Sequence, residues 1–158
     1  LHVDYAYYLR GLAYFNKGKA SVHRFIPNEI SDESQRDPGS AFRSFQNFSD
    51  LIKKFPESEY IEDAEKRMRH LRNNLAENEI HIANYYMRRG AFIAAANRAR
   101  YVIENYDRTP VVPEALILMA KAYRVLEMED LASDALRVLK LNYPNHPGIY
   151  QIEELEIK

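Results

Sequence analysis

Residues 76–107, AENEIHIANYYMRRGAFIAAANRARYVIENYD, decide the fold. Apolar residues of helical period lie on both sides of Gly90. They are Ala83, Tyr86 and Met87 before it, and Phe92, Ala95, Ala96, Ala99, Val102 and Ile103 after it. Because Gly90 has no Cβ, it can adopt the left-handed conformation that ends one helix and lets the next fold back. The alanines let the two helix axes approach closely, so this stretch predicts a helical hairpin.

Composition describes an ordinary globular protein. The 158 residues are 46% hydrophobic and 28% charged, with a formal net charge of -1. That balance argues against a nucleic-acid-binding surface as the main function. The chain has no cysteine, which excludes disulfides and thiol chemistry. No apolar run approaches the roughly 18 residues that a membrane-spanning helix needs. Helical patterning starts almost at Leu1 without an initiator methionine, so we expect a piece of a longer protein.

Further hairpins are predicted on both sides of this stretch. We expect a single helical repeat domain over residues 1–158, with a hairpin at 4–56, a hairpin at 58–107, a hairpin at 110–144 and a terminal helix at 148–158. In the first hairpin, the predicted helix 4–15 is followed by an inserted loop at 17–37, and Asp37-Pro38 is typical of the next helix start. No glycine or proline occurs between Glu57 and Arg89, which predicts one long helix over about 59–89.

A repeat runs through these hairpins. A small residue followed by tyrosine three positions later occurs at Gly11/Tyr14, Ala83/Tyr86 and Ala120/Tyr123. Tyr106 and Tyr143 end successive units 37 residues apart, close to the roughly 34-residue tetratricopeptide period. The chain resembles that pattern, with three departures: Ser44 for alanine, Asp107 for proline and Glu127 for glycine. The resemblance implies an all-α fold of tetratricopeptide-like hairpins stacked in a right-handed superhelix with a capping helix at the C-terminus.

Particular strings carry a closer resemblance. They are Asp4-Tyr5, Leu9-Arg10-Gly11-Leu12, Arg36-Asp37-Pro38, the Phe42/Phe45/Phe48/Leu51 spacing, Phe55-Pro56-x-Ser58-x-Tyr60, Tyr85-Tyr86-x-x-Arg89-Gly90-Ala91 and Asn97-Arg98. In this order and spacing they resemble the BamD (YfiO/ComL) outer-membrane assembly lipoproteins over essentially the whole chain. The resemblance implies a non-enzymatic scaffold segment, the C-terminal part of such a lipoprotein, at the periplasmic face of the bacterial outer membrane.

The same resemblance implies partners. The family's C-terminal repeats dock onto BamA-like POTRA domains of the barrel-forming subunit and onto other lipoproteins of the assembly machine. Recognition of unfolded outer-membrane proteins belongs to N-terminal repeats that this chain lacks, and membrane attachment belongs to an absent N-terminal lipid anchor. The arginine of the family's Asn-Arg step, a docking contact, falls on Arg98. Asn97, Arg89 and Tyr101 are further candidates for a protein-binding surface.

Nothing in the pattern predicts catalysis, a cofactor or a metal site. The sequence has no glycine-rich phosphate loop and no nucleophile arrangement. His70 and His81 lie three helical turns apart, about 16 Å, which is too far to share a metal. Residues 66–72 contain a basic cluster with three open interpretations: a solvated helix surface, a dock for an acidic partner or a phosphate-binding patch.

Two other functions remain open from the sequence. One is a peptide-binding tetratricopeptide adaptor, whose groove holds an extended segment of a client or chaperone. The other is a periplasmic coordinator of cell-wall enzymes built from similar repeats. A short peptide that saturates this chain by itself would favour the adaptor.

Overall fold

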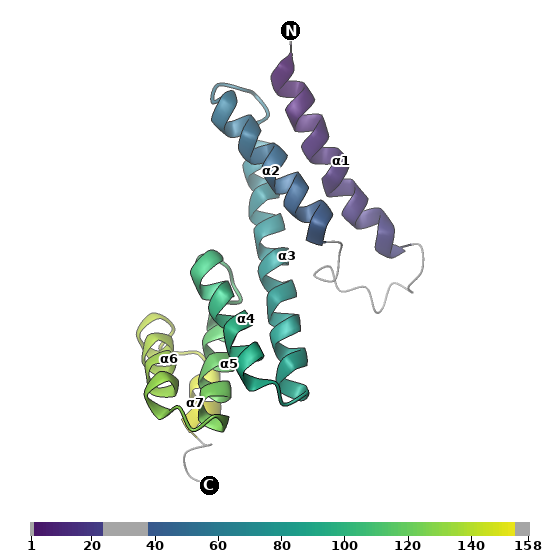
Figure 1. Cartoon of the computed structure of the whole chain (residues 1–158). Helices are drawn as coiled ribbons and strands as arrows, with labels where there is room; N and C mark the ends of the chain where they lie inside the picture. The colour runs from purple at the N-terminus through teal and green to yellow at the C-terminus, as the bar shows by residue number, and fades with distance from the viewer. Residues whose placement is uncertain (1, 24–37, 154–158) are drawn as a thin grey trace. The chain divides into compact units, whose positions relative to one another are not determined.

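A computed structural model describes residues 2–23 and 38–153, and every regular element among them is an α-helix (Figure 1). The helices are α1 (Val3–His23), α2 (Pro38–Lys54), α3 (Ile61–Arg88), α4 (Phe92–Asn105), α5 (Val112–Val125), α6 (Glu129–Asn142) and α7 (Gly148–Glu153). The prediction of an all-α fold of paired helices is confirmed. So is the long helix, α3, with 28 residues. The right-handed superhelix stays a prediction.

The chain divides into two compact units, residues 1–75 and 76–158. In the first unit, α1 and α2 run antiparallel side by side (Figure 1) and share a core with the first half of α3. Phe48 and Leu51 are fully buried at its centre, together with Ala64 of α3. Aromatic rings extend this core: Tyr8 stacks on Tyr60 with ring centroids 4.7 Å apart.

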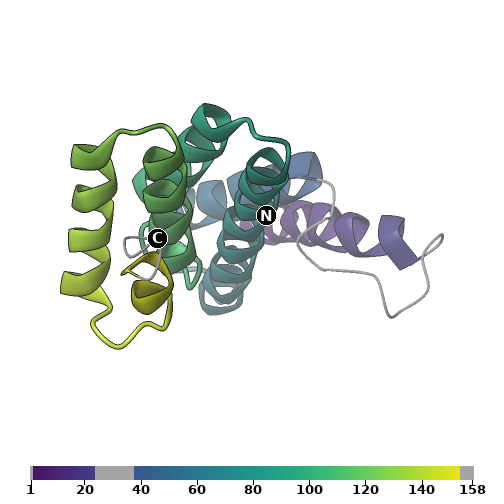
Figure 2. The same ribbon diagram turned by 90° about the horizontal axis from the view of Figure 1, so that it is seen from below.

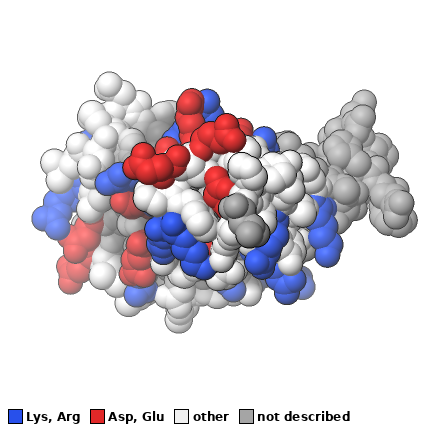
Figure 3. Space-filling model, turned by 90° about the horizontal axis from the view of Figure 1, so that it is seen from above, with Lys and Arg blue, Asp and Glu red and all other residues white. Residues whose placement is uncertain are grey.

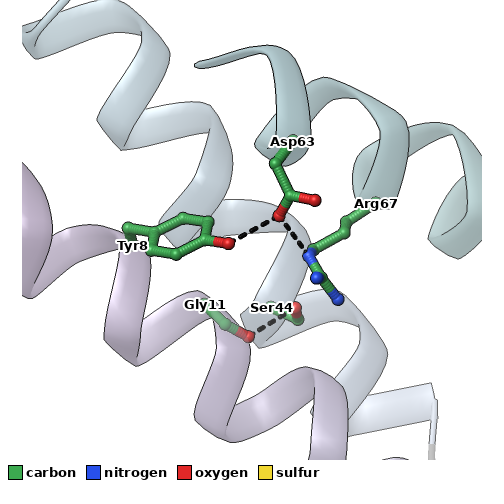
Figure 4. Close-up of polar contacts among 5 residues, drawn as sticks. All are labelled: Tyr8, Gly11, Ser44, Asp63 and Arg67. Carbon is green, nitrogen blue, oxygen red and sulfur yellow. Dashed lines mark hydrogen bonds and ion pairs between the residues drawn. The ribbon is translucent and has the colours of Figure 1, made fainter. Parts of the chain in front are cut away.

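Gly11 of α1 lies directly against the Phe48 ring of α2. A Cβ built on Gly11 would lie 2.4 Å from Cε1 of Phe48, far inside van der Waals contact. The hydroxyl of buried Ser44 donates a hydrogen bond of 2.8 Å to the Gly11 carbonyl oxygen across the same crossing (Figure 4). The glycine inside α1 therefore allows close packing of α1 against α2. This packing offsets the cost of about 1 kcal/mol that a glycine adds to a helix.

In the second unit, α3, α4 and α5 pack around small residues. Ala83 of α3, Ala99 of α4 and Ala115 of α5 are all fully buried in one cluster. A second cluster joins α5 to α6 and α7, which lie beside each other in Figure 2. Short side chains at these crossings let the helices approach, and longer neighbours such as Val102 and Leu139 fill the remaining space.

The terminal helix α7 covers part of α5 and α6. Its Ile149 and Ile152 are buried against them, and Glu153 forms a 2.6 Å ion pair with Lys140 of α6. A Cβ on Gly148 would overlap Cδ1 of Ile117, so the absence of a side chain at Gly148 lets the start of α7 lie close to α5. The predicted cap over the apolar edge is confirmed to Glu153, and residues 154–158 lie outside the described residues.

The predicted start of the loop at residue 17 is wrong. α1 does not end near Phe15 but continues to His23. Gly18 favours the start of a loop, yet a glycine inside a helix costs only about 1 kcal/mol, and no proline follows before Pro27. The remaining loop residues, 24–37, lie outside the described part of the chain. The predicted helix start at Pro38 is confirmed.

Two turns share one geometry with different residues. After α3, Gly90 has φ +74°, the Gly90 N–H donates to the Met87 carbonyl, and the Ala91 N–H donates to the Tyr86 carbonyl. After α5, Glu127 has φ +58°, and the same two bonds connect residues 127 and 128 to the last turn of α5. Glu127 thus occupies the position where the repeat pattern has glycine, and its Cβ makes that left-handed backbone strained.

These turns make a matched pair of predictions. Glu127→Gly should stabilise the protein by about 0.5–1 kcal/mol because it removes a left-handed non-glycine residue, whereas Gly90→Ala should destabilise it by about 1 kcal/mol. No atom lies within 4 Å of the Cβ position at Gly90, so its cost would be conformational. Urea unfolding followed by circular dichroism measures both. Shifts of the same sign would contradict the assignment.

The crossing of α1 and α2 gives a second prediction. Gly11→Ala should cost about 1–3 kcal/mol, because the added methyl group meets the Phe48 ring. In a double-mutant cycle, Phe48→Leu should cost less in the Gly11→Ala background than alone, since the smaller side chain relieves the clash. Thermal unfolding of the four proteins tests it, and strict additivity would show that the ring and glycine do not interact.

Candidate protein-docking surface

The outer face of α4 carries three of the four predicted site residues. Asn97, Arg98 and Tyr101 lie within one helical face, opposite the buried Ala95 and Ala99. All three are exposed. The structure therefore brings these residues together on a surface that the core of the second unit does not use.

Glu79 holds the Arg98 side chain. Nη1 of Arg98 donates to Oε2 of Glu79 at 2.9 Å, from α4 to α3. The carboxylate of Glu79 raises the pKa of the Arg98 guanidinium above its usual value, with a smaller contribution from Tyr86. The Glu79 side chain is 16% exposed and that of Arg98 44% exposed. A guanidinium has five N–H donors, so this bond orients Arg98 and leaves donors for a second carboxylate.

Asn97 and Tyr101, the neighbours of Arg98 on this face, make contacts of different kinds within the protein. Oδ1 of Asn97 accepts a 2.8 Å hydrogen bond from Nη2 of Arg100. The Tyr101 ring, 44% exposed, meets Tyr106 edge-on with centroids 5.9 Å apart. These contacts fix the side chains before any partner arrives, which lowers the entropy cost of binding.

Arg89, the fourth predicted residue, lies apart from this face. It follows α3 in the Gly90 turn, where its guanidinium lies 5.7 Å from the centroid of the Tyr85 ring. Tyr85 is itself 48% exposed. The structure brings Arg89 together with Tyr85 and shows no contact between Arg89 and Arg98.

Sequence reasoning missed two residues of this site. Ile93 of α4, one turn before Asn97, is 65% exposed and adds an apolar contact area. The other is Glu79 of α3, although an antiparallel hairpin about Gly90 places the C-terminal half of α3 alongside α4. The exposed isoleucine, on a helix whose other apolar residues face the core, was the available signal.

The basic cluster of residues 66–72 is largely engaged within the first unit. Lys66 pairs with Glu62 at 2.7 Å, and Nε of Arg67 donates to Oδ2 of Asp63 at 2.5 Å. The same Asp63 oxygen accepts a 2.6 Å bond from the Tyr8 hydroxyl, which ties α1 to α3 (Figure 4). Basic and acidic side chains both occur across the face in Figure 3. This favours a helix surface with paired charges over a phosphate-binding patch.

Tyr60, the last residue of the Phe55-Pro56-x-Ser58-x-Tyr60 string, packs against the core of the first unit. Its ring lies between Tyr8 and Tyr5, whose centroids are 4.7 and 5.4 Å away. The hydrogen bond to Glu59 is the largest cause that raises the pKa of Tyr60 to about 12. Tyr60 therefore packs against α1 instead of presenting its ring to a partner.

A comparison with protein families identifies the chain. A family model described as YfiO, outer membrane lipoprotein, matches residues 2–139. The chain belongs to this family. No helix of residues 2–23 and 38–153 combines the length and the apolar character needed to cross a bilayer.

Individual relatives agree with the family. The chain is 42% identical to an outer membrane protein assembly factor BamD of Neisseria gonorrhoeae over 146 residues, which are 92% of this chain and 54% of that protein. Proteins of the same name from Xylella fastidiosa (strain Temecula1) and Vibrio cholerae are 34% and 32% identical over 94% and 89% of this chain, and over 50% and 57% of their own lengths. The chain thus spans about half the length of these relatives.

The Tyr8–Asp63–Arg67 contacts predict a pH dependence. The pKa of Asp63 is lowered below its ordinary value of 3.8. The hydrogen bond from Arg67 is the largest cause, followed by the hydrogen bond from Tyr8. A lowered folded-state pKa adds stability above the unfolded-state pKa, and that stability is lost as the pH falls through the folded value. Wild type should therefore lose more stability than Asp63→Asn below about pH 4.

Urea titrations at a series of pH values measure this difference. Glu62→Gln is the matched control, since its 2.7 Å pair with Lys66 is far more exposed, with side chains 82% and 60% accessible. It should change the pH dependence less than Asp63→Asn does. If the free energy of unfolding depends on pH equally in wild type and Asp63→Asn, the ionised Asp63 does not contribute to stability as proposed.

Proposed function

We propose that this chain is a non-enzymatic scaffold segment of the machine that assembles outer-membrane β-barrel proteins. Its place would be the periplasmic face of the bacterial outer membrane. Family membership supports this role, as does the name outer membrane protein assembly factor that its relatives bear. The observation that carries the proposal is the exposed α4 face, where Arg98 is oriented by Glu79 and surrounded by Ile93 and Tyr101.

In this proposal the α4 face docks onto a periplasmic POTRA domain of the barrel-forming subunit. Tyrosine and arginine are favoured in interface cores, and exposed Ile93 adds apolar area. A carboxylate of the partner would join Glu79 at the Arg98 guanidinium. A charge-assisted bond of this kind contributes roughly 1.5–3 kcal/mol when the interface excludes water.

Other parts of the role belong to the whole protein. Accessory lipoproteins of the machine would bind further surfaces of these repeats. Binding of unfolded outer-membrane proteins and lipid anchoring would belong to N-terminal regions of the family. We propose no catalytic step, because the site is a fixed helix face with exposed, paired side chains and suits binding.

Charge reversal at Arg98 tests the docking proposal. Arg98→Glu should abolish co-purification with the POTRA domains of the barrel-forming subunit, because it places a carboxylate against both Glu79 and the partner's acid. Arg98→Gln should weaken binding without that repulsion. An affinity pull-down with purified POTRA domains detects the loss of binding, and isothermal titration calorimetry measures the dissociation constant of each variant.

Arg137→Glu on α6 is the control. Arg137 is also an exposed, paired helix arginine, 2.7 Å from Asp134, but it lies outside the α4 face. Circular dichroism confirms folding of each variant. Unaltered binding by folded Arg98→Glu would remove Arg98 from the interface, and equal losses for Arg137→Glu would show a general charge effect.

A further inference from the structure

Helix α2 has two apolar stripes, and the core uses only one of them fully. The buried stripe includes Phe48 and Leu51. The second follows Phe42, Phe45, Ser49 and Ile52, in steps of three, four and three residues. Phe42 is 55% exposed, and the other three are half-buried. Alternating steps of three and four residues are the pattern with which two helices pack along a seam. We call these four residues the α2 outer stripe.

Hollows lie along both sides of the α2 outer stripe, and Phe45 lines both. One hollow, of about 440 Å³, includes Phe42 and Lys53 of α2 and Arg10 of α1. The other, of about 350 Å³, includes Ile52 of α2 and Met68 and Arg69 of α3. The outer stripe is therefore a ridge between two shallow grooves, into which side chains of a second helix could fit.

Cations outnumber acids along these grooves. Arg10 and Lys53 line the first together with one acid, Asp50. Arg69 and Arg72 line the second together with one acid, Glu65. Helix α2 itself carries Arg43, Lys53 and Lys54 against Asp50 alone. The chain as a whole has a formal net charge of -1, so this excess of positive charge is a local property. It would attract an acidic partner.

We propose that the α2 outer stripe is a docking site for one amphipathic helix of another protein, with an apolar seam and acidic residues on both sides of it. The seam of that helix would pack over Phe42, Phe45 and Ile52. Its acidic flanks would lie near the cations of the two grooves. This site goes beyond the docking role of the α4 face, because it uses none of the same residues.

Charge also decides between a partner helix and a second copy of this chain. A symmetric dimer brings the same patch of both molecules together. Packing the α2 outer stripe on its copy would bring the groove cations of the two molecules, among them Arg10, Lys53 and Arg69, close together, which is repulsive. An acidic helix instead complements this surface. The helical spacing of the stripe favours a helix over an extended peptide, whose side chains alternate with a period of two.

A designed peptide tests the proposal directly. The probe is a fluorescein-labelled peptide of about 18 residues, near the 17-residue length of α2, with leucine at heptad positions a and d and glutamate at e and g. Fluorescence anisotropy with the 158-residue chain should show saturable binding that weakens as salt is added. The same peptide with lysine at e and g should bind on the order of tenfold more weakly or worse.

Variants locate the site. Phe42→Ser should weaken the glutamate peptide on the order of tenfold, because it removes the most exposed apolar residue of the stripe. Arg69→Glu should weaken it and reduce its salt dependence. Leu141→Ser is the matched control, since Leu141 is 76% exposed on α6 and should leave binding unchanged.

Several results would overturn the proposal. They are equal binding of the lysine peptide, equal binding of a proline-interrupted peptide of the same composition, no effect of Phe42→Ser, or an equal effect of Leu141→Ser. Light scattering that shows a dimer of the chain, converted to monomer by Phe42→Ser, would assign the stripe to self-association. A photo-crosslinker at position 42 that reacts with residues 24–37 of the same molecule in the presence of peptide would also exclude a partner helix.

Discussion

The close approach of neighbouring helices at small residues is the constraint on which this structure depends. Every core cluster among the described residues contains alanine, and the close crossing of α1 and α2 has Gly11 beneath the ring of Phe48. Two helices at short distance bury more surface per residue and leave few voids. A methyl group in the wrong place at such a crossing would separate the axes and open the core.

Polar groups at these crossings are satisfied within the fold. Ser44 stands where the repeat pattern has alanine, yet its hydroxyl is buried without loss because it donates to the Gly11 carbonyl oxygen. The Tyr8 hydroxyl donates a hydrogen bond to Asp63, and Asp63 forms an ion pair with Arg67. The polar atom of this core tyrosine is therefore satisfied. Glu127 is the departure that is not compensated, because its backbone keeps a left-handed φ of +58°.

The cores use one face of α2 and one face of α4, so the opposite faces of these two helices remain available for partners. On α4 that face presents a guanidinium held by Glu79 beside an isoleucine and a tyrosine. On α2 it presents an apolar ridge with cations on both sides. The docking roles proposed for α4 and α2 need surfaces of this kind: fixed in shape, partly apolar and marked by charge.

The sequence by itself determined the helices and most of their limits. Helical periodicity, the glycine at position 90 and the proline at position 38 are local signals, and a helix is stabilised by local bonds. The ordered strings from Asp4-Tyr5 to Asn97-Arg98 also indicated the family. Local signals failed at Gly18, where one glycine was too weak to end α1. Only the tertiary structure decided that Glu79 orients Arg98, that Ser44 bonds to Gly11 and that the second stripe of α2 stays outside the core. Each of these facts depends on which faces of separate helices meet, and that is fixed by packing between residues far apart in the chain.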